Sequence, residues 1–145
     1  MFRELLDDGL HIRVCLPPTT YYIQHIKSVV ATLPRSHRFK FGITVQPHYR
    51  YYEAHYGYSK HRTQQRDGAK YVEMVVVYAH HSRDVVAILE HSLIDVYAGN
   101  PMCANRKTDF DNHIRNDDSC SENEDSEGPF TVYICHGEAI MPCTT

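Results

Sequence analysis

Alternation of hydrophobic and polar residues predicts most of the strands of this chain. The period of two appears in residues 10–16, 39–44 and 130–134. Residues 69–79 form a continuous apolar run that is rich in β-branched side chains. That composition and length are typical of a strand that is buried on both faces. We therefore expect four strands, with 69–79 inside the sheet.

Helical periodicity appears in two longer stretches between these strands. Residues 22–33 place apolar side chains on one face until Pro34 stops the pattern, and residues 82–97 do the same until Gly99. A shorter helix is predicted for residues 48–55, because Pro47 suits a first helical turn. Residues 57–68 are polar and basic without periodicity, so we expect a loop there.

The order of these elements predicts a single α+β domain, with a small, mostly antiparallel sheet flanked by helices. Residues 1–108 and 129–145 would form this domain. Residues 109–128 have low hydrophobicity and many acidic side chains, a composition typical of disordered segments. We therefore expect an acidic, disordered insertion between the third helix and the last strand.

Charge is distributed unevenly along the chain. Residues 34–70 contain eight Lys or Arg and two acids, whereas residues 109–127 contain eight acids and one Arg. Clustered cations are typical of proteins that bind the phosphate backbone of nucleic acids. The alternative is a surface that only keeps the protein soluble. The acidic segment 109–127 could bind a protein partner or cover the basic surface of its own chain.

Cysteine usage and hydropathy indicate the compartment. The five Cys are odd in number, no signal peptide is visible at the start, and no apolar stretch approaches the length of a membrane span. We expect an intracellular protein of a reducing compartment, nucleus or cytoplasm, without membrane association. The Cys and His of residues 103–143 lack the two-to-four-residue separation of zinc knuckles, so the sequence does not favour zinc.

Three residues suggest where chemistry could occur. Gly42 interrupts a strand pattern, which indicates a bulge or a close approach of another group to the backbone. Arg50 follows on the next helix, and a guanidinium there could bind phosphate oxygens. The alternative is an edge strand followed by a solvated arginine. Glu90 borders the apolar stripe of its helix, either as a flanking charge or as a carboxylate directed into a cleft.

Residues 39–106 resemble the GIY-YIG endonuclease superfamily, in particular its variants with a Tyr-Lys-Ile-Gly-x-Thr second strand. Phe39-Lys40-Phe41-Gly42-Ile43-Thr44 fits that strand, and Arg50 follows Gly42 at the distance seen in the family. Glu90 lies in a Leu-Glu-x-x-Leu-Ile helix, like the metal-binding glutamate of the family. Asn105 stands in the loop after that helix, where the family often has an asparagine.

The resemblance implies a phosphodiesterase that cleaves DNA with Mg²⁺ or Mn²⁺. Glu90 would bind the metal and Arg50 would stabilise charge on the phosphoryl oxygens. Further residues would contact the nucleic acid: Lys40, Gly42, Lys60, His61, Arg62, Arg66 and Asn105. The alternatives from other classes are a catalytically silent nucleic-acid-binding module on the same scaffold and a protein-interaction domain with an acidic partner.

The chain departs from the family at the tyrosine that helps to deprotonate the attacking water. In the family this tyrosine precedes the second strand, but here residues 26–33 read as helix and contain no Tyr. Three sources could replace it: Tyr21 or Tyr22, His55 or His61, and Tyr133 in Thr131-Val132-Tyr133-Ile134.

Two geometric expectations follow. Gly42, Arg50 and Glu90 should meet on one concave surface. Residues 39–44 need a partner strand, since an exposed apolar edge favours aggregation. The candidates are residues 10–16 and 130–134, and because only the second contains a tyrosine we expect residues 130–134 to pair there and direct Tyr133 toward Arg50.

Overall fold

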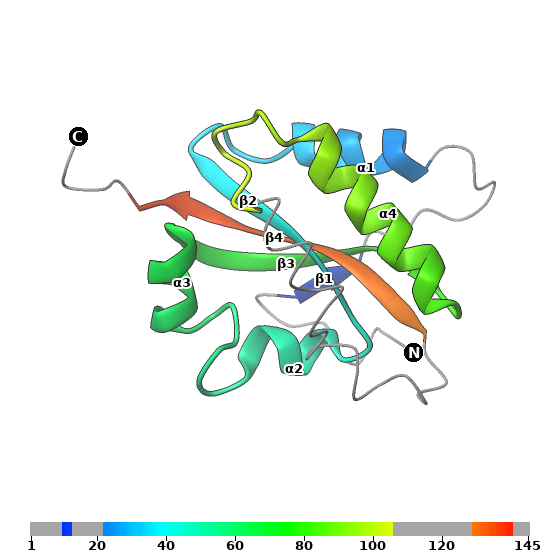
Figure 1. Ribbon diagram of the computed structural model, residues 1–145. Coiled ribbons are helices and arrows are strands. Elements are labelled where there is room, and N and C mark those ends of the chain that lie inside the picture. The colour runs from blue at the N-terminus through cyan, green and yellow to red at the C-terminus, as the bar shows by residue number, and fades with distance from the viewer. Residues whose placement is uncertain (1–9, 13–21, 106–128, 141–145) are drawn as a thin grey trace.

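The computed structural model describes residues 10–12, 22–105 and 129–140 as one sheet with helices on both faces (Figure 1). The elements in chain order are β1 (Leu10–Ile12), α1 (Tyr22–Ala31), β2 (His37–Thr44), α2 (Pro47–Tyr52), α3 (His61–Asp67), β3 (Ala69–His80), α4 (Arg83–Val96) and β4 (Phe130–Ala139). The strands lie in the order β1-β3-β4-β2. β4 is antiparallel to both β2 and β3, and β1 is parallel to β3. The expected α+β fold with a mostly antiparallel sheet is confirmed.

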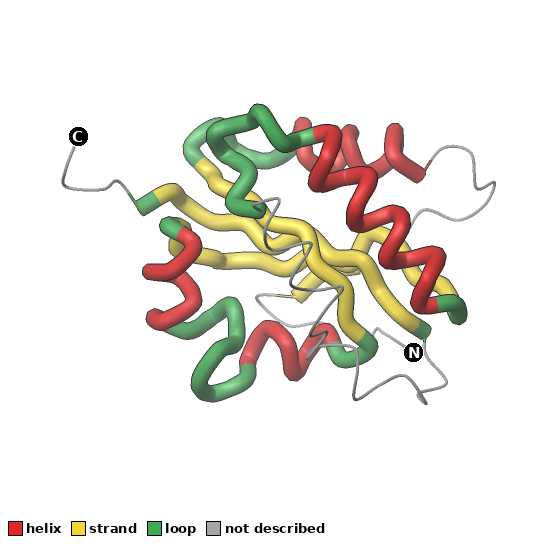
Figure 2. The backbone as a smooth tube through the Cα atoms, viewed as in Figure 1, coloured by secondary structure: helices red, strands yellow, loops and turns green. Residues whose placement is uncertain are grey.

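The helices form two layers, as Figure 2 shows, with α1 and α4 on one face and α2 and α3 on the other. The larger core lies under α1 and α4, and consists mainly of aliphatic side chains with Phe39, Phe41 and Phe130. The smaller core, under α2 and α3, is rich in tyrosine and contains Tyr51 and Tyr58. The two faces of the sheet are therefore chemically different, and the polar aromatic face is the one that carries Arg50.

The last strand lies in the middle of the sheet. β4 pairs with β2 in a register that sets Tyr133 directly opposite Gly42. Side chains alternate along it, so Val132 and Ile134 enter the larger core while Tyr133 enters the smaller one. The predicted pairing of residues 130–134 with 39–44 is confirmed, although β4 continues to Ala139. Residues 39–44 consequently lie at the edge of the sheet.

The edge of β2 that faces away from β4 is covered by the segment that follows α4. The Phe39 amide donates to the Met102 carbonyl at 2.9 Å, and the Ala104 amide donates to the Phe39 carbonyl at 2.7 Å. The Asn105 side chain then accepts from the Phe41 amide at 2.7 Å and donates to the Phe41 carbonyl at 3.0 Å. These bonds satisfy backbone groups that an open edge would offer to another chain.

Two predictions about local structure were wrong. Residues 57–68 contain α3, which ends at Gly68 in the left-handed conformation (φ 70°). Only Thr63 of this helix is buried, so there is no apolar stripe for a periodicity search to find. The predicted helix 48–55 is shorter, since α2 ends at Tyr52. Residues 13–16 and 109–128 lie outside the described part, and within the described ranges no helix is long and apolar enough to cross a membrane.

Three polar side chains form a hydrogen-bonded chain on the sheet near the start of β2. The Nδ1 atoms of His37 and His136 lie 2.8 Å apart, and Nε2 of His136 donates to the Glu73 carboxylate at 2.5 Å. Burial and the neighbouring His136 lower the pKa of His37, while the carboxylates of Glu138 and Glu73 act in the opposite direction. A neutral His37 can share one proton with His136, whereas two doubly protonated rings cannot form this contact.

This arrangement predicts acid sensitivity. Because the folded pKa of His37 is lowered, the unfolded state binds more protons near pH 6, and the stability contributed by neutral His37 is lost as the pH falls through its folded pKa. We expect the urea midpoint of His37→Gln to depend less on pH between about 7 and 5. The exposed His48→Gln serves as the control, and a wild-type-like pH profile for His37→Gln would contradict the prediction.

Candidate functional site

The centre of the candidate site is the contact between Gly42 and Tyr133. A Cβ atom at position 42 would overlap the hydroxyl oxygen of Tyr133 and the adjacent ring carbon. The tyrosine ring therefore crosses the neighbouring strand where that strand has no side chain. The close approach expected at Gly42 is confirmed, and the approaching group is a side chain of the same protein.

Arg50 and Tyr58 complete this cluster. The Tyr133 hydroxyl shares a hydrogen bond of 2.8 Å with the Tyr58 hydroxyl and accepts from Arg50 Nε at 3.4 Å. The Arg50 guanidinium also lies 5.1 Å from the centre of the Tyr58 ring, a cation–π distance. Arg50 projects from α2, whose first turn begins at Pro47 as expected. The predicted orientation of Tyr133 toward Arg50 is confirmed.

The electrostatics of the cluster keep the arginine charged and the Tyr133 phenol neutral. The oxygen atoms of Tyr133 and Tyr58 raise the pKa of Arg50. Burial and the neighbouring Tyr58 raise the pKa of Tyr133 well above its ordinary value, while the charge of Arg50 acts in the opposite direction. At neutral pH the cluster is therefore a cation that rests on two hydrogen-bonded phenols.

Lys40 adds a second cation to the same face. Its Nζ atom lies 3.3 Å from Asp67 Oδ2 and 6.0 Å from the centre of the Tyr58 ring. Asp67 also accepts from Arg66 Nε at 3.0 Å and from the Tyr71 hydroxyl at 2.9 Å. Burial alone would raise the pKa of Asp67, but Lys40 and these hydrogen bonds lower it overall. The ionised Asp67 carboxylate therefore holds Lys40 beside Tyr58 through an ion pair.

Glu90 belongs to the helical layer opposite to that of Arg50. It lies on α4, which packs with the larger core, and only 2% of its surface is exposed. Burial raises the pKa of the Glu90 carboxyl to about 8, while the charges of Lys40 and Arg50 act to lower it. The three charges therefore interact across the edge strand β2. Gly42 and Arg50 share the contact with Tyr133, but the meeting of Glu90 with them on one concave surface stays a prediction.

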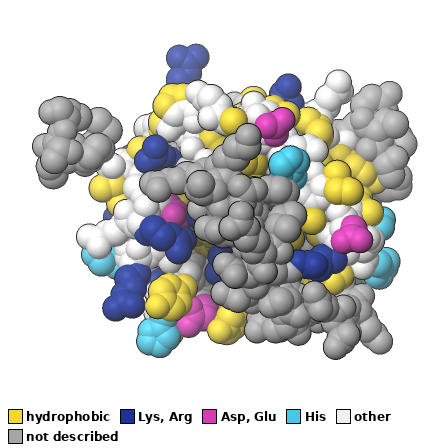
Figure 3. All heavy atoms as spheres, viewed as in Figure 1, with side chains coloured by type: hydrophobic (Ala, Val, Ile, Leu, Met, Phe, Trp, Pro, Cys, Tyr) yellow, Lys and Arg dark blue, Asp and Glu magenta, His cyan; other side chains and the backbone are white. Residues whose placement is uncertain are grey.

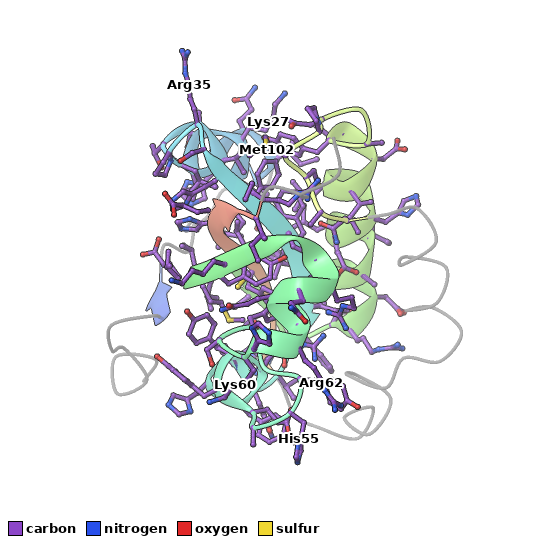
Figure 4. The ribbon with its side chains drawn as sticks, turned by 90° about the vertical axis from the view of Figure 1, so that its left-hand side faces the viewer. Lys27, Arg35, His55, Lys60, Arg62 and Met102 are labelled. Carbon is purple, nitrogen blue, oxygen red and sulfur yellow. The ribbon has the colours of Figure 1, made fainter. Side chains whose placement is uncertain are left out.

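Other predicted site residues lie apart from this cluster. His55, His61 and Arg62 are exposed, and Figure 4 shows His55, Lys60 and Arg62 directed outward at the lower end of the molecule. Tyr22 packs against Tyr78, with ring centres 4.3 Å apart, on the face of the sheet that α1 covers. Among the described residues, the side-chain contacts of Arg50 are with Tyr133 and Tyr58 and not with His55, His61 or Tyr22, while Tyr21 lies outside the described residues.

The structure gives Asn105 a role that the sequence did not suggest, and it adds Tyr58 to the site. The amide of Asn105 binds both backbone groups of Phe41, so it holds the edge of the sheet, and its contact with nucleic acid stays untested. Tyr58 was not predicted, because it stands in a segment without periodicity. The signal that could have pointed to it is the tyrosine content of the chain, which has eleven Tyr and no Trp.

Comparison with family models, with curated proteins and with solved structures gives no match for this chain. The resemblance to the GIY-YIG superfamily therefore rests on its own residues. Among the described residues, no group of three or more His, Cys, Asp or Glu side chains is arranged to hold a metal ion. Glu90 is the carboxylate whose charge is coupled to Arg50 and Lys40.

The Gly42–Tyr133 contact can be tested by adding one methyl group. Alanine normally suits a strand better than glycine, but at position 42 it would overlap the buried Tyr133 hydroxyl. We expect Gly42→Ala to lower the free energy of unfolding by about 1–3 kcal/mol. Gly99→Ala is the matched control, because a Cβ there meets no atom within 4 Å. Equal urea midpoints for the two variants would contradict the assigned contact.

Burial of Glu90 predicts a gain in stability when its charge is removed. Its folded pKa of about 8 lies above the unfolded value, so its favourable contribution is complete at low pH and is lost as the pH rises through about 8. We expect Glu90→Gln to be more stable than the parent at pH 8 in EDTA by up to about 3 kcal/mol, and equally stable near pH 4.5. Parallel pH profiles of the two proteins would show that Glu90 titrates normally.

Proposed function

We propose that this chain is a divalent-metal-dependent endonuclease that hydrolyses phosphodiester bonds of DNA. The main support is the contact of Tyr133 with Gly42 and Arg50. The family resemblance requires a tyrosine on the strand beside the glycine strand, near the helix arginine. Here β4 supplies that tyrosine from the other end of the chain, in the register that sets it opposite Gly42.

Arg50 is suited to bind a phosphate. Its Nε atom is held by Tyr133 and its charge is maintained by the two phenol oxygens, so the guanidinium is preorganised before a ligand arrives. Preorganised charge stabilises a transition state more effectively than charge that must first reorient. In this proposal the remaining guanidinium N–H groups donate to the non-bridging oxygens of the phosphate that is cleaved.

Tyr133 and Tyr58 would hold the arginine in place. Their hydroxyl groups lie 2.8 Å apart, so their hydrogen bond fixes the position of the Tyr133 oxygen that accepts from Arg50. The raised pKa of Tyr133 means that it is not a phenolate before reaction. We therefore assign to Tyr133, which is hydrogen-bonded to Tyr58, the orientation of Arg50.

Glu90 would hold the cation. A carboxylate is a hard oxygen donor, and Mg²⁺ or Mn²⁺ can be bound through a single protein carboxylate because Mg²⁺ keeps several of its waters. Burial raises the pKa of the Glu90 carboxyl to about 8 and the charges of Lys40 and Arg50 only oppose this, so the carboxyl group would lose its proton as the cation binds. When bound, the cation would offset negative charge on the phosphate and on the leaving oxygen.

A catalytically silent nucleic-acid-binding module is the second candidate. It is favoured by the burial of Tyr133 and Glu90, since a proton acceptor and a metal ligand must be reached by water and substrate. In that case Arg50, Lys40 and the exposed cations of α3 would retain DNA without cutting it.

The compartment belongs to the same proposal. Cys103 and Cys135 are free thiols among the described residues, which supports a reducing compartment, nucleus or cytoplasm.

Cleavage of plasmid DNA with Mg²⁺ or Mn²⁺ tests the function. We expect Arg50→Lys, which keeps the charge but loses the guanidinium fork, and Glu90→Gln to lower the rate by about 100-fold or more. Tyr133→Phe should also be slowed. Arg35→Ala is the matched control, because Arg35 points outward at the opposite end of the molecule from α3 (Figure 4).

The outcomes separate the candidates. Cleavage by Glu90→Gln at the parent rate would indicate a contaminating nuclease and contradict the proposal. DNA retention without cleavage by the parent protein would identify the silent module. Tyr133→Phe cutting at the parent rate would remove the phenol from the mechanism while leaving Arg50 and Glu90 in place.

A further inference from the structure

Two tyrosine rings stand exposed beside the candidate site. Tyr49 on α2 and Tyr56 in the following turn are 60% and 56% exposed, whereas Tyr51 and Tyr58 of the same segment are buried. We call Tyr49 and Tyr56 the tyrosine patch. A large ring left in water within a segment that buries its other tyrosines indicates a surface available for a ligand.

The backbone beneath the tyrosine patch is tightly held. The Glu53 amide donates to the Tyr49 carbonyl at 2.8 Å, and the Glu53 carboxylate accepts from the Tyr56 amide at 2.6 Å. Gly57 follows in a turn so close that a Cβ there would meet the backbone of Tyr51 and Glu53. Both rings therefore project from a short, preorganised stretch, which limits the conformational entropy that a ligand must remove.

Cations lie next to this stretch. The Thr63 hydroxyl donates to the Tyr56 carbonyl at 2.9 Å, which fixes the start of α3 beside the tyrosine patch. Lys60, Arg62 and Arg66 belong to this part of the chain, and Arg62 and Arg66 are exposed. Figure 3 shows Lys and Arg side chains over α3, with hydrophobic, acidic and His side chains below them. Tyr49 directly precedes Arg50 on α2, so one ring of the tyrosine patch shares its helix with the candidate site.

We propose that the tyrosine patch binds unpaired nucleotides of a nucleic-acid strand. Bases would stack on Tyr49 and Tyr56 while Lys60 and Arg62 contact phosphates, an arrangement typical of single-strand binding. In a duplex both faces of each base are already stacked, so exposed rings select strands that are unpaired. This inference rests on the proposed function and narrows its substrate to DNA with a single-stranded segment next to Arg50.

A protein partner would use exposed tyrosines differently. The described residues next to the tyrosine patch include the exposed His48 and His55, the cations of α3 and the single carboxylate of Glu53, rather than aliphatic side chains. At a protein interface, the residues around the rings would instead include few charged side chains and more apolar ones. The excess of cations and imidazoles favours a polyanion with flat, stackable groups.

Binding of labelled 15-nucleotide strands in EDTA tests the proposal, because no cleavage is expected there. The probes are oligo-dT, a strand of equal length and charge built from abasic sites, and a duplex of equal length. The full-length protein should bind oligo-dT at least about 10-fold more tightly than the abasic strand. Tyr49→Ala with Tyr56→Ala should lose this preference, whereas Tyr49→Phe with Tyr56→Phe, which keeps both rings, should retain it.

Charge and stacking are distinguished by a further variant. Lys60→Ala with Arg62→Ala should weaken binding of all three probes and reduce the dependence of affinity on salt. Equal affinity of the parent protein for oligo-dT and the abasic strand would overturn the inference and leave a purely electrostatic surface. Unchanged oligo-dT binding by the alanine pair would also overturn it and leave the rings available to a protein.

The proposed function and the role of the tyrosine patch are tested by different measurements, DNA cleavage and strand binding. A protein that prefers oligo-dT but cuts no DNA with Mg²⁺ or Mn²⁺ would contradict the endonuclease and support the tyrosine patch. A protein that cuts DNA in a Glu90-dependent way but binds oligo-dT no more tightly than the abasic strand would support the endonuclease and contradict the role of the tyrosine patch.

Discussion

The packing of Tyr133 over Gly42 is the contact on which the candidate site depends. Tyr133 comes from the last described strand and Gly42 from the second, and only the absence of a Cβ at position 42 lets the ring cross between them. The hydroxyl then holds Arg50 on one side and Tyr58 on another. One missing methyl group thus allows three segments of the chain to meet.

The two buried carboxyl groups around this contact have pKa values that are shifted in opposite directions. Asp67 is surrounded by Lys40, Arg66 and Tyr71, and its pKa is lowered. Glu90 is buried with its pKa raised to about 8, although the same Lys40 acts on it. Asp67 therefore supports the fold, whereas Glu90 carries an electrostatic penalty that folding alone does not explain. Strongly perturbed acids of this kind are concentrated at functional sites.

The pairing of β4 brings together residues that lie far apart in the sequence. β4 pairs with β2 on one side and with β3 on the other, so the last described strand lies inside the sheet. Because side chains alternate, the register that buries Val132 and Ile134 under α4 also directs Tyr133 to the face of Arg50. The larger core and the candidate site are thus set by the same hydrogen-bonded pairing.

The sequence by itself determined the elements with strong periodicity and the place of a close backbone approach. β3, α1 and α4 follow from apolar runs and stripes, and Gly42 stands out because a glycine is unfavourable in a strand unless another group needs the space. Arg50 and Tyr133 could be matched through strand pairing because β2 needed a partner. These features are local, or depend on a pairing that few strands could satisfy.

Only the tertiary structure decided the rest. α3 buries one residue, so its helix depends on Gly68 and on contacts with its neighbours rather than on an apolar pattern. Tyr58 and Asn105 gained their partners, the Tyr133 hydroxyl and the Phe41 backbone, from segments far away in the sequence. The burial of Glu90 and the exposure of Tyr49 depend on how α4 and α2 face the sheet. A linear pattern carries no information about such contacts, because they arise only when separate elements pack together.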